Sequence, residues 1–493
     1  MEPPRSPERG EPALDDFPAT LTSIVDGSWT SFGNGPVREF ADPSTGLSVG
    51  RFEEAAPDVV DAAVESAHRA WQGDWARMAP ADRGRVLLAC AQAFRDNATV
   101  LARLESLDTG KPVSQARSDV DVTVRYLEYY AGACDKIAGQ TLSQPVGTLA
   151  YTLREPYGVV AHITPWNAPL SQMMRGVAPS LAAGNSVVVK PSELTPLTTT
   201  LAALLMAEAG LPDGLCNVVL GEGGTVGQAL VRHELVQHIT FTGSVATGRL
   251  VGRAAAERIV GCNLELGGKS PTIVCADADL DRAASAGALA VVRNSGQSCF
   301  ATTRLLVERR VHDEFVDLLT AQLAGLSIGP GLQDPDLGPL VSEQQRQRVL
   351  ALVEQARSDG ARVVTGGSDG GFAAGWFVTP TLVTDVTNDM PIAQTEVFGP
   401  VQSVLTFDDL DQAVQMANDT QFGLSAGVFT SDLSRAHRLA AALHAGQVQV
   451  NRYSGAGVEV PFGGYKSSGI GREKGMDALL HYSQVKSVIV ALE

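Results

Sequence analysis

Residues 158–163 read Gly158-Val159-Val160-Ala161-His162-Ile163, a short and largely apolar run that predicts a β-strand. A helix-like stretch follows this run and extends to residue 183. The same alternation continues with predicted strands at residues 186–189, 217–220 and 238–241. Near-continuous apolar strands that are separated by helices are typical of βαβ units, in which helices cover both faces of a parallel sheet. We therefore predict an α/β fold with a parallel sheet.

The segments on either side extend this α/β pattern. Apolar residues recur at helical spacing over residues 56–134, and a turn cluster at residues 108–112 separates two of the predicted helices. Beyond Cys262 a second alternation of strands and helices begins, and it runs to about residue 429. A chain of 493 residues is too long for one ordinary core, so we expect two or three domains.

Composition and charge restrict the partners of this chain. Its 38 basic and 55 acidic residues give a net charge of −17, which repels phosphate backbones and anionic lipids, so we expect no nucleic acid and no membrane as partner. Six scattered cysteines without a C-x-x-C pair argue against a disulfide framework and a structural zinc site, and we predict no metal. We also expect a flexible tail over residues 1–19 and a cytoplasmic location.

The chain ends on a predicted strand at residues 483–490 that has no obvious hairpin partner nearby. An unpaired terminal strand is an aggregation hazard unless another strand covers it. Two arrangements meet this need equally well: the strand pairs across a subunit interface, or it forms an edge strand within its own chain. We take the first as a hypothesis and expect a homodimer or homotetramer.

The run Asn294-Ser295-Gly296-Gln297-Ser298-Cys299 lies where a predicted helix gives way to a short loop. It presents one cysteine after a glycine, with amide and hydroxyl groups beside it. Such a thiol is either a buried small hydrophobic group or a nucleophile. A nucleophile would need a base, oxyanion donors and an electron acceptor.

Two polar residues are candidates for those partners. Asn167 follows the first strand in Pro165-Trp166-Asn167, where its amide can donate to a developing oxyanion, although asparagine is commoner as a turn residue. Glu265 lies between leucines in Leu264-Glu265-Leu266-Gly267-Gly268, and partial burial there raises the pKa of a carboxylate toward the range of a general base. The alternative is that Glu265 is an exposed strand residue.

Two further segments indicate a dinucleotide. Lys190-Pro191-Ser192-Glu193 ends the second strand, and ligands of such sheets bind beyond the carboxyl ends of the strands. A carboxylate there can accept both hydroxyls of an adenosine ribose and would repel a 2′-phosphate, which favours NAD over NADP. Glycines and Ser244 open a helix after the strand at residues 238–241, where free N–H groups can hold a pyrophosphate. A solvated loop and an ordinary helix cap are the respective alternatives.

Two other segments are imperfect phosphate motifs. Gly268-Lys269-Ser270 looks like the end of a phosphate-binding loop, but Asn263 stands where that motif requires a glycine. The glycines within residues 221–224 come close to a dinucleotide fingerprint, but Val226 occupies its third glycine position. We therefore predict no phosphate site from either segment alone.

Taken in order, the motifs resemble those of the aldehyde dehydrogenase superfamily, and the resemblance covers nearly the whole chain after the tail. Each motif alone is unspecific, whereas the series is highly specific. The series comprises Pro165-Trp166-Asn167, Lys190-Pro191-Ser192-Glu193, Phe241-Thr242-Gly243-Ser244, Leu264-Glu265-Leu266-Gly267-Gly268-Lys269, Gly296-Gln297-Ser298-Cys299, Glu396-Val397-Phe398-Gly399-Pro400 and Pro461-Phe462-Gly463-Gly464-Tyr465-Lys466-Ser467-Ser468-Gly469.

The resemblance implies a Rossmann-like cofactor domain, an α/β catalytic domain and a small β oligomerisation element with a hairpin near residues 139–155. The expected boundaries are residues 20–135 and 156–263 for the NAD-binding domain, 264–435 for the catalytic domain, 136–155 and 478–493 for the oligomerisation element, and 436–477 for a returning segment with site loops.

The resemblance also implies an enzyme that oxidises an aldehyde to a carboxylic acid with NAD. Cys299 would attack the aldehyde carbon to give a thiohemiacetal, and Asn167 with the Cys299 backbone N–H would hold the oxyanion. Hydride transfer to NAD would leave a thioester. Glu265 would activate the water that hydrolyses it, with Glu473 as a relay partner. The implied cofactor residues are Ile163, Thr164, Pro165, Trp166, Lys190, Ser192, Glu193, Gly223, Gly227, Phe241, Gly243, Ser244, Leu266, Glu396 and Phe398.

The chain departs from the family's pattern at three places. Ala246 replaces a glutamate that many members carry, so one outer cofactor contact is in doubt. Gly176 replaces a lysine that is common in the proton relay, which leaves the proton route from Glu265 open. Ala456-Gly457 replaces a serine in the substrate loop of some members.

The predicted substrate residues are Arg175, Arg293 and Phe462. Members that oxidise succinic semialdehyde resemble this chain in having both arginines, where they hold the substrate carboxylate, and paired guanidinium groups bind a carboxylate well. The alternatives are that Arg175 pairs with a neighbouring acid and that Arg293 only complements a helix end. We therefore hypothesise a semialdehyde or, because the pocket is roomier, a bulky or cyclic aldehyde.

Two other activities would use the same cysteine. A thiol hydrolase needs a histidine partner, and none of the eight histidines lies in a motif that suggests one. A CoA-acylating relative would lack the hydrolytic carboxylate, and Glu265 argues against it. The hydrolysing, NAD-dependent enzyme is therefore the prediction with the most support in the sequence.

Overall fold

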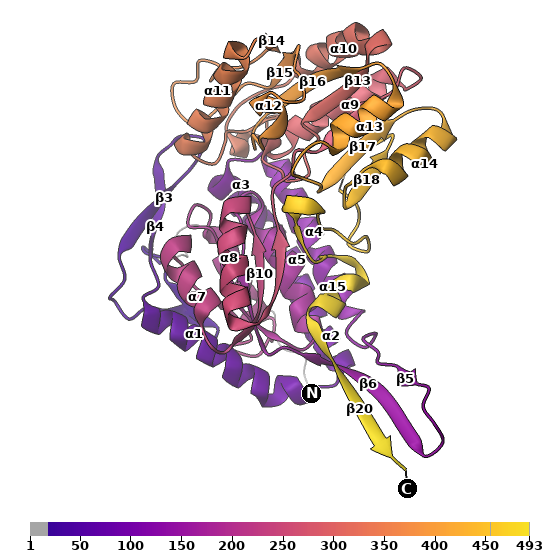
Figure 1. Cartoon of the computed structure of the whole chain (residues 1–493). Coiled ribbons are helices and arrows are strands. Elements are labelled where there is room, and N and C mark those ends of the chain that lie inside the picture. The colour runs from indigo at the N-terminus through magenta and orange to yellow at the C-terminus, as the bar shows by residue number, and fades with distance from the viewer. Residues whose placement is uncertain (1–17, 454, 493) are drawn as a thin grey trace.

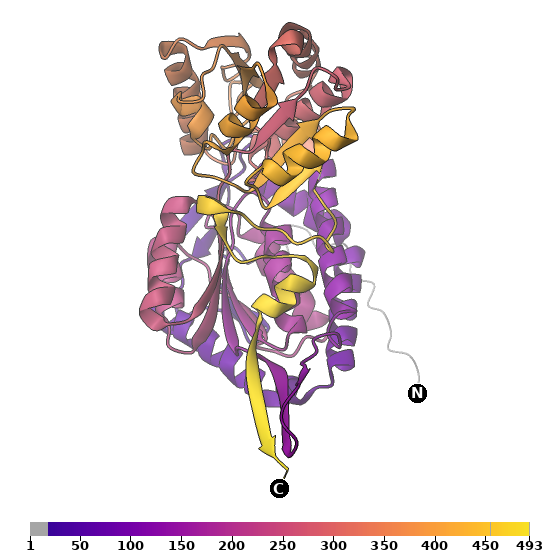
Figure 2. The ribbon, with the colours of Figure 1, turned by 45° about the vertical axis from the view of Figure 1, so that its right-hand side comes forward.

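The computed structural model describes residues 18–453 and 455–492, so the predicted tail lies almost entirely outside the described residues. An eight-stranded, a seven-stranded, a three-stranded and a two-stranded sheet organise this part of the chain. In Figures 1 and 2 the seven-stranded sheet lies above the eight-stranded one, and the three-stranded sheet projects from the lower end. Among the described helices, none is both long and apolar enough to cross a membrane.

The eight-stranded sheet has the order β19-β11-β10-β7-β8-β9-β1-β2. Its strands are β1 (Ser23–Val25), β2 (Ser28–Thr30), β7 (Val159–Ile163), β8 (Ser186–Lys190), β9 (Cys216–Val218), β10 (Val236–Thr242), β11 (Gly261–Glu265) and β19 (Gly469–Ile470). The run from β11 to β9 is parallel, which confirms the predicted parallel sheet. Because parallel strands end on the same edge, the segments after β7, β8 and β10 lie close together.

Helices cover both faces of this sheet, since alternate residues of a strand point to opposite sides. Val187 and Val189 join the core on one face, and Val188 joins the core on the other. The first face carries α2 (Pro80–Asp96), α3 (Ala98–Thr109), α4 (Val113–Ala131), α5 (Pro169–Ala182) and α6 (Leu197–Glu208). The second carries α1 (Pro57–Ala70), α7 (Gln228–Arg232) and α8 (Val245–Arg258). The helices and the turn predicted over residues 56–134 are confirmed.

The seven-stranded sheet has the order β14-β15-β16-β13-β12-β17-β18. Its strands are β12 (Pro271–Val274), β13 (Arg304–Glu308), β14 (Arg362–Thr365), β15 (Thr381–Thr384), β16 (Val401–Phe407), β17 (Ser425–Phe429) and β18 (Gln447–Val450). Only β14 runs antiparallel, and the second predicted α/β alternation is thus confirmed. β18 belongs to this sheet although it lies beyond residue 435, where the resemblance places the end of the catalytic domain.

Helices again lie on both faces of this sheet. Leu306 joins one core and Val307 the other. One face carries α11 (Glu343–Ser358), α12 (Pro391–Gln394), α13 (Leu410–Asn418) and α14 (Leu433–Ala442), and the other carries α9 (Leu280–Val292) and α10 (His312–Ala324). A short helix α15 (Gly475–His481) and a two-stranded sheet of β3 (Val37–Ala41) and β4 (Ser48–Glu53) complete the two layers.

The three-stranded sheet consists of β5 (Thr141–Leu142), β6 (Thr148–Pro156) and the terminal strand β20 (Ser483–Ala491). β20 pairs antiparallel with β6 along its whole length, so the terminal strand is an edge strand within its own chain. Of the two arrangements that the sequence left open, the structure therefore contains the intramolecular one. The far edge of β20 has no partner strand within the described residues.

The turn between α3 and α4 is held by a buried cation, which gives a stability prediction. Lys111 Nζ lies 2.6 Å from Asp119 Oδ2 and 3.2 Å from Glu105 Oε1, and the Lys111 side chain is 1% exposed. Lys111→Met would leave two carboxylates without their cation, and we expect it to lower the free energy of unfolding by about 3–5 kcal/mol. Chemical denaturation monitored by tryptophan fluorescence measures this loss.

The exposed pair of Arg117 and Asp121 supplies the matched control for that measurement, because both side chains are more than half exposed. Arg117→Met should change the free energy of unfolding by less than about 1 kcal/mol. Equal effects of the two substitutions would contradict the assigned role of Lys111.

Candidate active site

Three cavities lie in series in this part of the molecule, and Cys299 lies where two of them meet. The α4 cavity, about 420 Å³, is lined by one face of α4, and the central cavity, about 190 Å³, is lined by Glu265. The α8 cavity, about 560 Å³, borders one side of α8 along most of the helix, from Thr247 to Glu257. Cys299 and Asn167 belong to the walls of both the α4 and the central cavity, and Trp166 belongs to the walls of both the central and the α8 cavity. The three cavities therefore form a series, with Cys299 where the first two meet.

The loop that carries Cys299 has an unusual backbone. After α9 ends, Asn294, Ser295 and Gly296 all have positive φ angles of 50°, 54° and 70°. A Cβ at position 296 would lie 2.2 Å from the carbonyl oxygen of Gly399, so only glycine fits there. Gln297 fixes the loop from inside, because its side chain donates to Asn294 O and accepts from Val341 N. The loop thus holds the cysteine in a fixed place, as the predicted helix-to-loop transition suggests.

Cys299 itself is half-buried. Burial raises the pKa of its thiol to about 12, and the nearby charge of Arg175 opposes this rise. A thiol with so high a pKa is protonated at neutral pH, so a reaction at its sulfur requires a group that accepts the proton. The remaining five cysteines are free as well and lie elsewhere in the two layers.

Asn167 connects the eight-stranded sheet with the Cys299 loop. It follows β7, is buried, and donates from Nδ2 to the carbonyl oxygen of Gln297 at 2.9 Å. Its own carbonyl accepts from Asn294 Nδ2 at 2.6 Å. The amide therefore lies at the cysteine loop, where a neutral donor can face a developing oxyanion.

Glu265 is the last residue of β11 and is only 2% exposed, so the alternative of an exposed strand residue is wrong. Neither of its carboxylate oxygens has a hydrogen-bond partner in the described part of the chain. Burial raises the pKa of Glu265 well above its usual value, and the negative charge of Glu473 adds to the rise, whereas Arg175 and Arg472 oppose it. A buried carboxylate with free oxygens and a raised pKa has the properties of a general base.

Arg175 and Glu473 form a buried ion pair beside Glu265. Arg175 also donates from Nη2 to Thr242 Oγ1 at 3.3 Å, and its Cζ lies 5.1 Å from the centre of the Phe462 ring. Pairing with a neighbouring acid was the alternative that the sequence left open for this arginine. Arg175 nevertheless lines the α4 cavity, as do Arg293 and Phe462, so all three predicted substrate residues surround one space.

The predicted cofactor residues divide between two cavities. Leu266, Glu396 and Phe398 line the central cavity. The α8 cavity is lined by Ile163, Thr164, Pro165, Trp166, Lys190, Ser192, Glu193, Gly223, Gly227, Phe241, Gly243 and Ser244. Every predicted cofactor residue therefore faces one continuous space, although the residues come from five separate segments and a π-helical turn over Gly223–Gly227.

The chemistry of the α8 cavity fits a dinucleotide. Lys190 is buried at the end of β8 and donates to Pro191 O at 2.8 Å and to Glu193 Oε2 at 3.3 Å, so a donor and a carboxylate lie side by side for a ribose diol. A Cβ at Gly223 would meet no protein atom within 4 Å, which leaves room beside this turn. Ser244 caps α8, because its side-chain oxygen accepts a hydrogen bond from Thr247 N. The same residue also lines the α8 cavity, so it has both the capping role and the predicted position.

Glu396 approaches the backbone of the Glu265 segment closely. The N–H of Gly268 donates to Glu396 Oε1 at 3.0 Å, and a Cβ at Gly267 would lie 2.1 Å from Glu396 Oε2. Glycine at position 267 is therefore required for this contact. Burial raises the pKa of Glu396 to about 7. Phe398 has a positive φ of 58° and contacts the Trp166 ring edge to face.

Several wall residues of the α4 cavity were not predicted from the sequence. They lie on one face of α4 and on the segments near it: Lys111, Gln115, Ser118, Asp119, Val122, Tyr126, Gln172, Gln447 and Lys474. The α4 members recur at spacings of three and four, which marks one helix face. That signal cannot distinguish a cavity wall from a solvated face unless the neighbouring elements are known.

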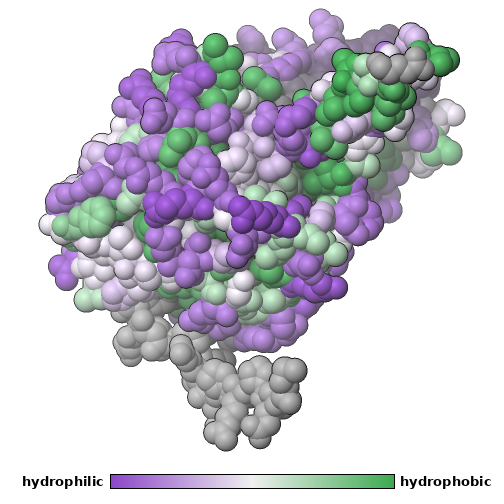
Figure 3. Space-filling model, turned by 90° about the horizontal axis from the view of Figure 1, so that it is seen from below, coloured by the Kyte–Doolittle hydropathy of each residue, from purple (hydrophilic) through white to green (hydrophobic). Residues whose placement is uncertain are grey.

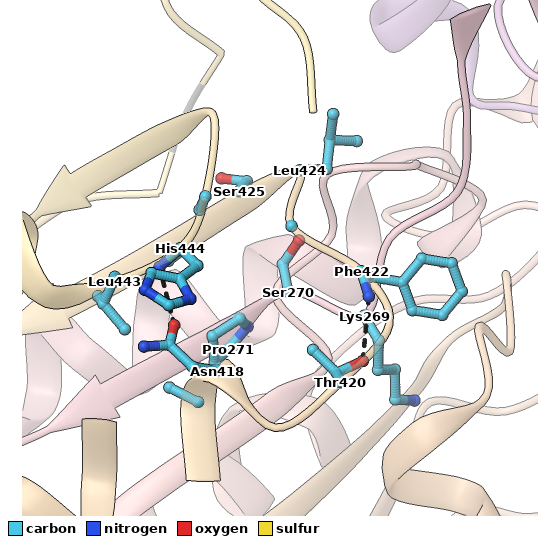
Figure 4. Close-up of a pocket in the computed structure, with 14 residues that line it drawn as sticks. Lys269, Ser270, Pro271, Asn418, Thr420, Phe422, Leu424, Ser425, Leu443 and His444 are labelled. Carbon is cyan, nitrogen blue, oxygen red and sulfur yellow. Dashed lines mark hydrogen bonds between the residues drawn. The ribbon is translucent and has the colours of Figure 1, made fainter. Parts of the chain in front are cut away.

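The imperfect phosphate motif Gly268-Lys269-Ser270 borders a separate small hollow, shown in Figure 4 with Lys269 and Ser270 among the labelled residues. Its volume is about 10 Å³, room for roughly one water molecule. Burial lowers the pKa of Lys269 to about 7. The hollow is too small for a phosphate group. Within the described residues, no group of three or more His, Cys, Asp or Glu side chains is placed to hold a metal ion.

Comparison with known proteins agrees with this geometry. A family model described as "Aldehyde dehydrogenase family" matches residues 29–488. A putative aldehyde dehydrogenase, DhaS, from Bacillus subtilis is 41% identical over 477 residues, which cover 96% of each chain. A betaine aldehyde dehydrogenase from Mesorhizobium japonicum is 44% identical over 96% of this chain and 97% of its own.

Solved structures give the same result. An aldehyde dehydrogenase from Bacillus cereus in complex with NAD+ superposes with a TM-score of 0.94 at 41% identity, covering 96% of this chain and 97% of that one. An indole-3-acetaldehyde dehydrogenase from P. syringae, solved with NAD+, superposes with a TM-score of 0.95 at 40% identity, covering 97% and 98%.

The raised pKa of Cys299 gives a prediction about thiol reactivity. Only the thiolate reacts with iodoacetamide, and an ordinary cysteine thiol has a pKa of about 8.5. Because the pKa of Cys299 is raised to about 12, its alkylation rate in the protein without ligands should still increase between pH 9 and pH 10. Mass spectrometry of the peptide that contains Cys299 measures this rate. A rate that is already constant by pH 8 would contradict the raised pKa.

Proposed function

The chain belongs to the aldehyde dehydrogenase family, and we propose that Cys299, Asn167 and Glu265 carry out its reaction. The reaction is the NAD-dependent oxidation of an aldehyde to a carboxylic acid, so the chain is an oxidoreductase. One observation carries the assignment of residues: Cys299 lines both the α4 cavity and the central cavity, and Glu265 lines the second. An aldehyde in the first cavity can therefore reach the sulfur, and a water molecule in the second can reach the carbon that becomes bound to it.

The first step is attack by the Cys299 sulfur on the aldehyde carbon. A carbon–sulfur bond forms, the thiol proton leaves, and negative charge develops on the former carbonyl oxygen. The amide of Asn167 and the backbone N–H of Cys299 donate to that oxygen. Because the thiol is protonated at neutral pH, attack and proton loss are coupled. The thiol proton passes to a water molecule, so this step does not require the Glu265 carboxylate, which acts in hydrolysis.

The residues that would hold NAD follow the α8 cavity into the central cavity. Lys190 and Glu193 would bind the hydroxyls of the adenosine ribose, and Ser244 with the N-terminus of α8 would bind the pyrophosphate. Glu396 and Phe398 would bind the nicotinamide ribose. When bound, NAD supplies the acceptor for the hydride that leaves the substrate carbon. The carboxylate of Glu193 would repel the 2′-phosphate of NADP, so NAD is the preferred cofactor in this proposal.

The last step is hydrolysis of the thioester on Cys299. Glu265 takes a proton from water, the hydroxide adds to the thioester carbon, and the carbon–sulfur bond breaks. The carboxylic acid leaves, and the proton held by Glu265 returns to the sulfur, which restores the thiol and the carboxylate. The unpartnered oxygens of Glu265 support this role, since they can accept a hydrogen bond from water without losing one to protein.

We propose an anionic aldehyde as the substrate class. Four cationic side chains line the α4 cavity, namely Lys111, Arg175, Arg293 and Lys474, against one carboxylate, Asp119. Buried carboxylates neutralise Lys111 and Arg175. The Arg293 side chain forms no hydrogen bond or ion pair with another described residue, so its charge is available to a substrate carboxylate. The sequence pointed to Ala456-Gly457 as a source of extra room; of this pair Ala456 lines the cavity, together with Gly455, and these small residues leave space for a long or cyclic chain.

Three wider assignments belong to this proposal. The eight-stranded sheet with its helices would form the NAD-binding domain, and the seven-stranded sheet the catalytic domain. The three-stranded sheet would serve assembly as a homodimer or homotetramer. This role in assembly is supported by the unpaired edge of β20 and by the exposed apolar residues Leu153, Val485 and Ile489. Figure 3 shows hydrophobic residues gathered at the projecting tip of the three-stranded sheet. Six free cysteines support a reducing, cytoplasmic location.

The catalytic assignment predicts the outcome of a simple substitution. Cys299→Ala should abolish NADH formation from a panel of aldehydes and NAD, because no other group is proposed to form the covalent intermediate. NADH absorbance measures the rate. Cys262→Ala is the matched control, since this half-buried thiol lies outside all three cavities, and it should leave the rate within about twofold. Full activity of Cys299→Ala would refute the mechanism.

The substrate proposal predicts a loss that depends on charge. Arg293→Met should lower kcat/KM for succinic semialdehyde roughly 10- to 100-fold, the worth of one hydrogen-bonded charge pair. For butanal, a neutral aldehyde of the same length, the change should stay within about twofold because no charge pair is lost. For Arg293→Lys, kcat/KM for succinic semialdehyde should lie between the values of the unmodified enzyme and of Arg293→Met. Equal losses for both aldehydes, or a preference of the unmodified enzyme for butanal, would overturn the anionic substrate.

A further inference from the structure

Arg175 is a charged side chain that the mechanism above does not use. It is 6% exposed and is fixed on three sides by groups from different parts of the chain. Glu473 pairs with its Nε, Thr242 accepts from its Nη2, and the Phe462 ring lies against its guanidinium. A side chain held so firmly is in place before any substrate binds.

Glu473 ties this arginine to the Phe462 segment, which lines the α4 cavity. It is 2% exposed, and its backbone exchanges two hydrogen bonds with Phe462, at 2.6 and 2.7 Å. Both partners of Arg175 in this segment are therefore locked to each other. The negative charge of Glu473 contributes to raising the pKa of six nearby ionisable groups, namely Glu265, Arg175, Tyr126, Tyr130, Lys474 and Tyr482.

Position 176 itself cannot carry the cation that the family pattern places there. A Cβ at Gly176 would lie 2.6 Å from His162 Nδ1 and 3.2 Å from the Tyr482 hydroxyl, so these two side chains fill the space of a longer residue. A cation for Glu473 must therefore come from another position. Arg175, the preceding residue, is the one that pairs with it.

We propose that Arg175 is a positioning residue of the hydrolytic step: it holds the Glu473 carboxylate beside Glu265 and takes the place of the missing lysine. This rests on the proposed role of Glu265 as the base. It also gives Arg175 a different task from the predicted grip on the substrate, because the buried carboxylate of Glu473 already balances its charge. Arg293 keeps the substrate role.

The consequence of losing Arg175 has a definite sign. Glu473 and Glu265 are two buried carboxylates, and the negative charge of the first raises the pKa of the second, whereas Arg175 lowers it. Without Arg175 the pKa of Glu265 rises further. A general base works only in its deprotonated form, so hydrolysis would need a higher pH, while attack by Cys299 and hydride transfer would still produce the first equivalent of NADH.

Rapid-mixing kinetics of Arg175→Met test the proposal. With NAD and succinic semialdehyde, we expect a burst of about one NADH per active site followed by turnover that is reduced roughly 10- to 100-fold at pH 7, with KM within about threefold. The pH at half-maximal kcat should move upward. Arg175→Lys, which keeps the charge, should recover part of the rate. A large rise in KM for the anionic aldehyde with unchanged kcat would overturn the proposal and assign Arg175 to the substrate.

The double variant Arg175→Met with Glu473→Gln keeps the test valid if the single variant folds poorly, because it removes both buried charges together. We expect it to turn over no more slowly than Arg175→Met, since the two residues act as one unit. If the double variant instead loses as much rate as two independent substitutions would together, the two residues do not act as one unit and the proposal is contradicted.

Glu265→Gln separates this inference from the proposed function. If Glu265→Gln turns over normally, the proposed function fails. If Glu265→Gln stops after the burst while Arg175→Met resembles the unmodified enzyme, only the present inference fails.

Discussion

The hydrogen bond from Asn167 Nδ2 to the carbonyl oxygen of Gln297 joins the two large layers close to Cys299. Asn167 follows β7 of the eight-stranded sheet, and Gln297 follows α9, a helix that packs on the seven-stranded sheet. The return bond from Asn294 Nδ2 to Asn167 O makes the connection two-sided. Neither layer alone holds a complete site, because Cys299 comes from one and Glu265 from the other. The chemistry therefore depends on how firmly the layers are held together at this point.

Burial of charge is the second constraint, and it explains why the site contains more ionisable groups than the reaction uses. A base with a raised pKa needs a dry environment, which would also destabilise every other charge nearby. Arg175 and Glu473 neutralise each other beneath Glu265, and Glu396 accepts a backbone N–H through a contact that only glycine permits. Arg175, Glu473 and Glu396 thus each have a polar partner, whereas the carboxylate oxygens of Glu265 have none within the described residues.

The sequence predicts the fold well because the strands are buried on both faces. Val187, Val188 and Val189 form one apolar run, and the two separate cores that they enter explain that pattern. Motif positions such as Lys190 also fall in the expected cavity. The partner of Arg175 could not be predicted, since Glu473 is far away in the chain and no local pattern joins them. The wall of the α4 cavity was missed for the same reason: a polar helix face has no signature of what lies opposite.

The covalent intermediate on Cys299 is the most direct test of the whole account. Glu265→Gln, incubated with NAD and succinic semialdehyde, should accumulate the acyl group as a thioester, because sulfur attack proceeds but water is not activated. Intact-protein and peptide mass spectrometry should find close to one acyl group per chain, on the peptide that contains Cys299. An enzyme that turns over normally with no adduct, or an adduct on another residue, would contradict the central claim.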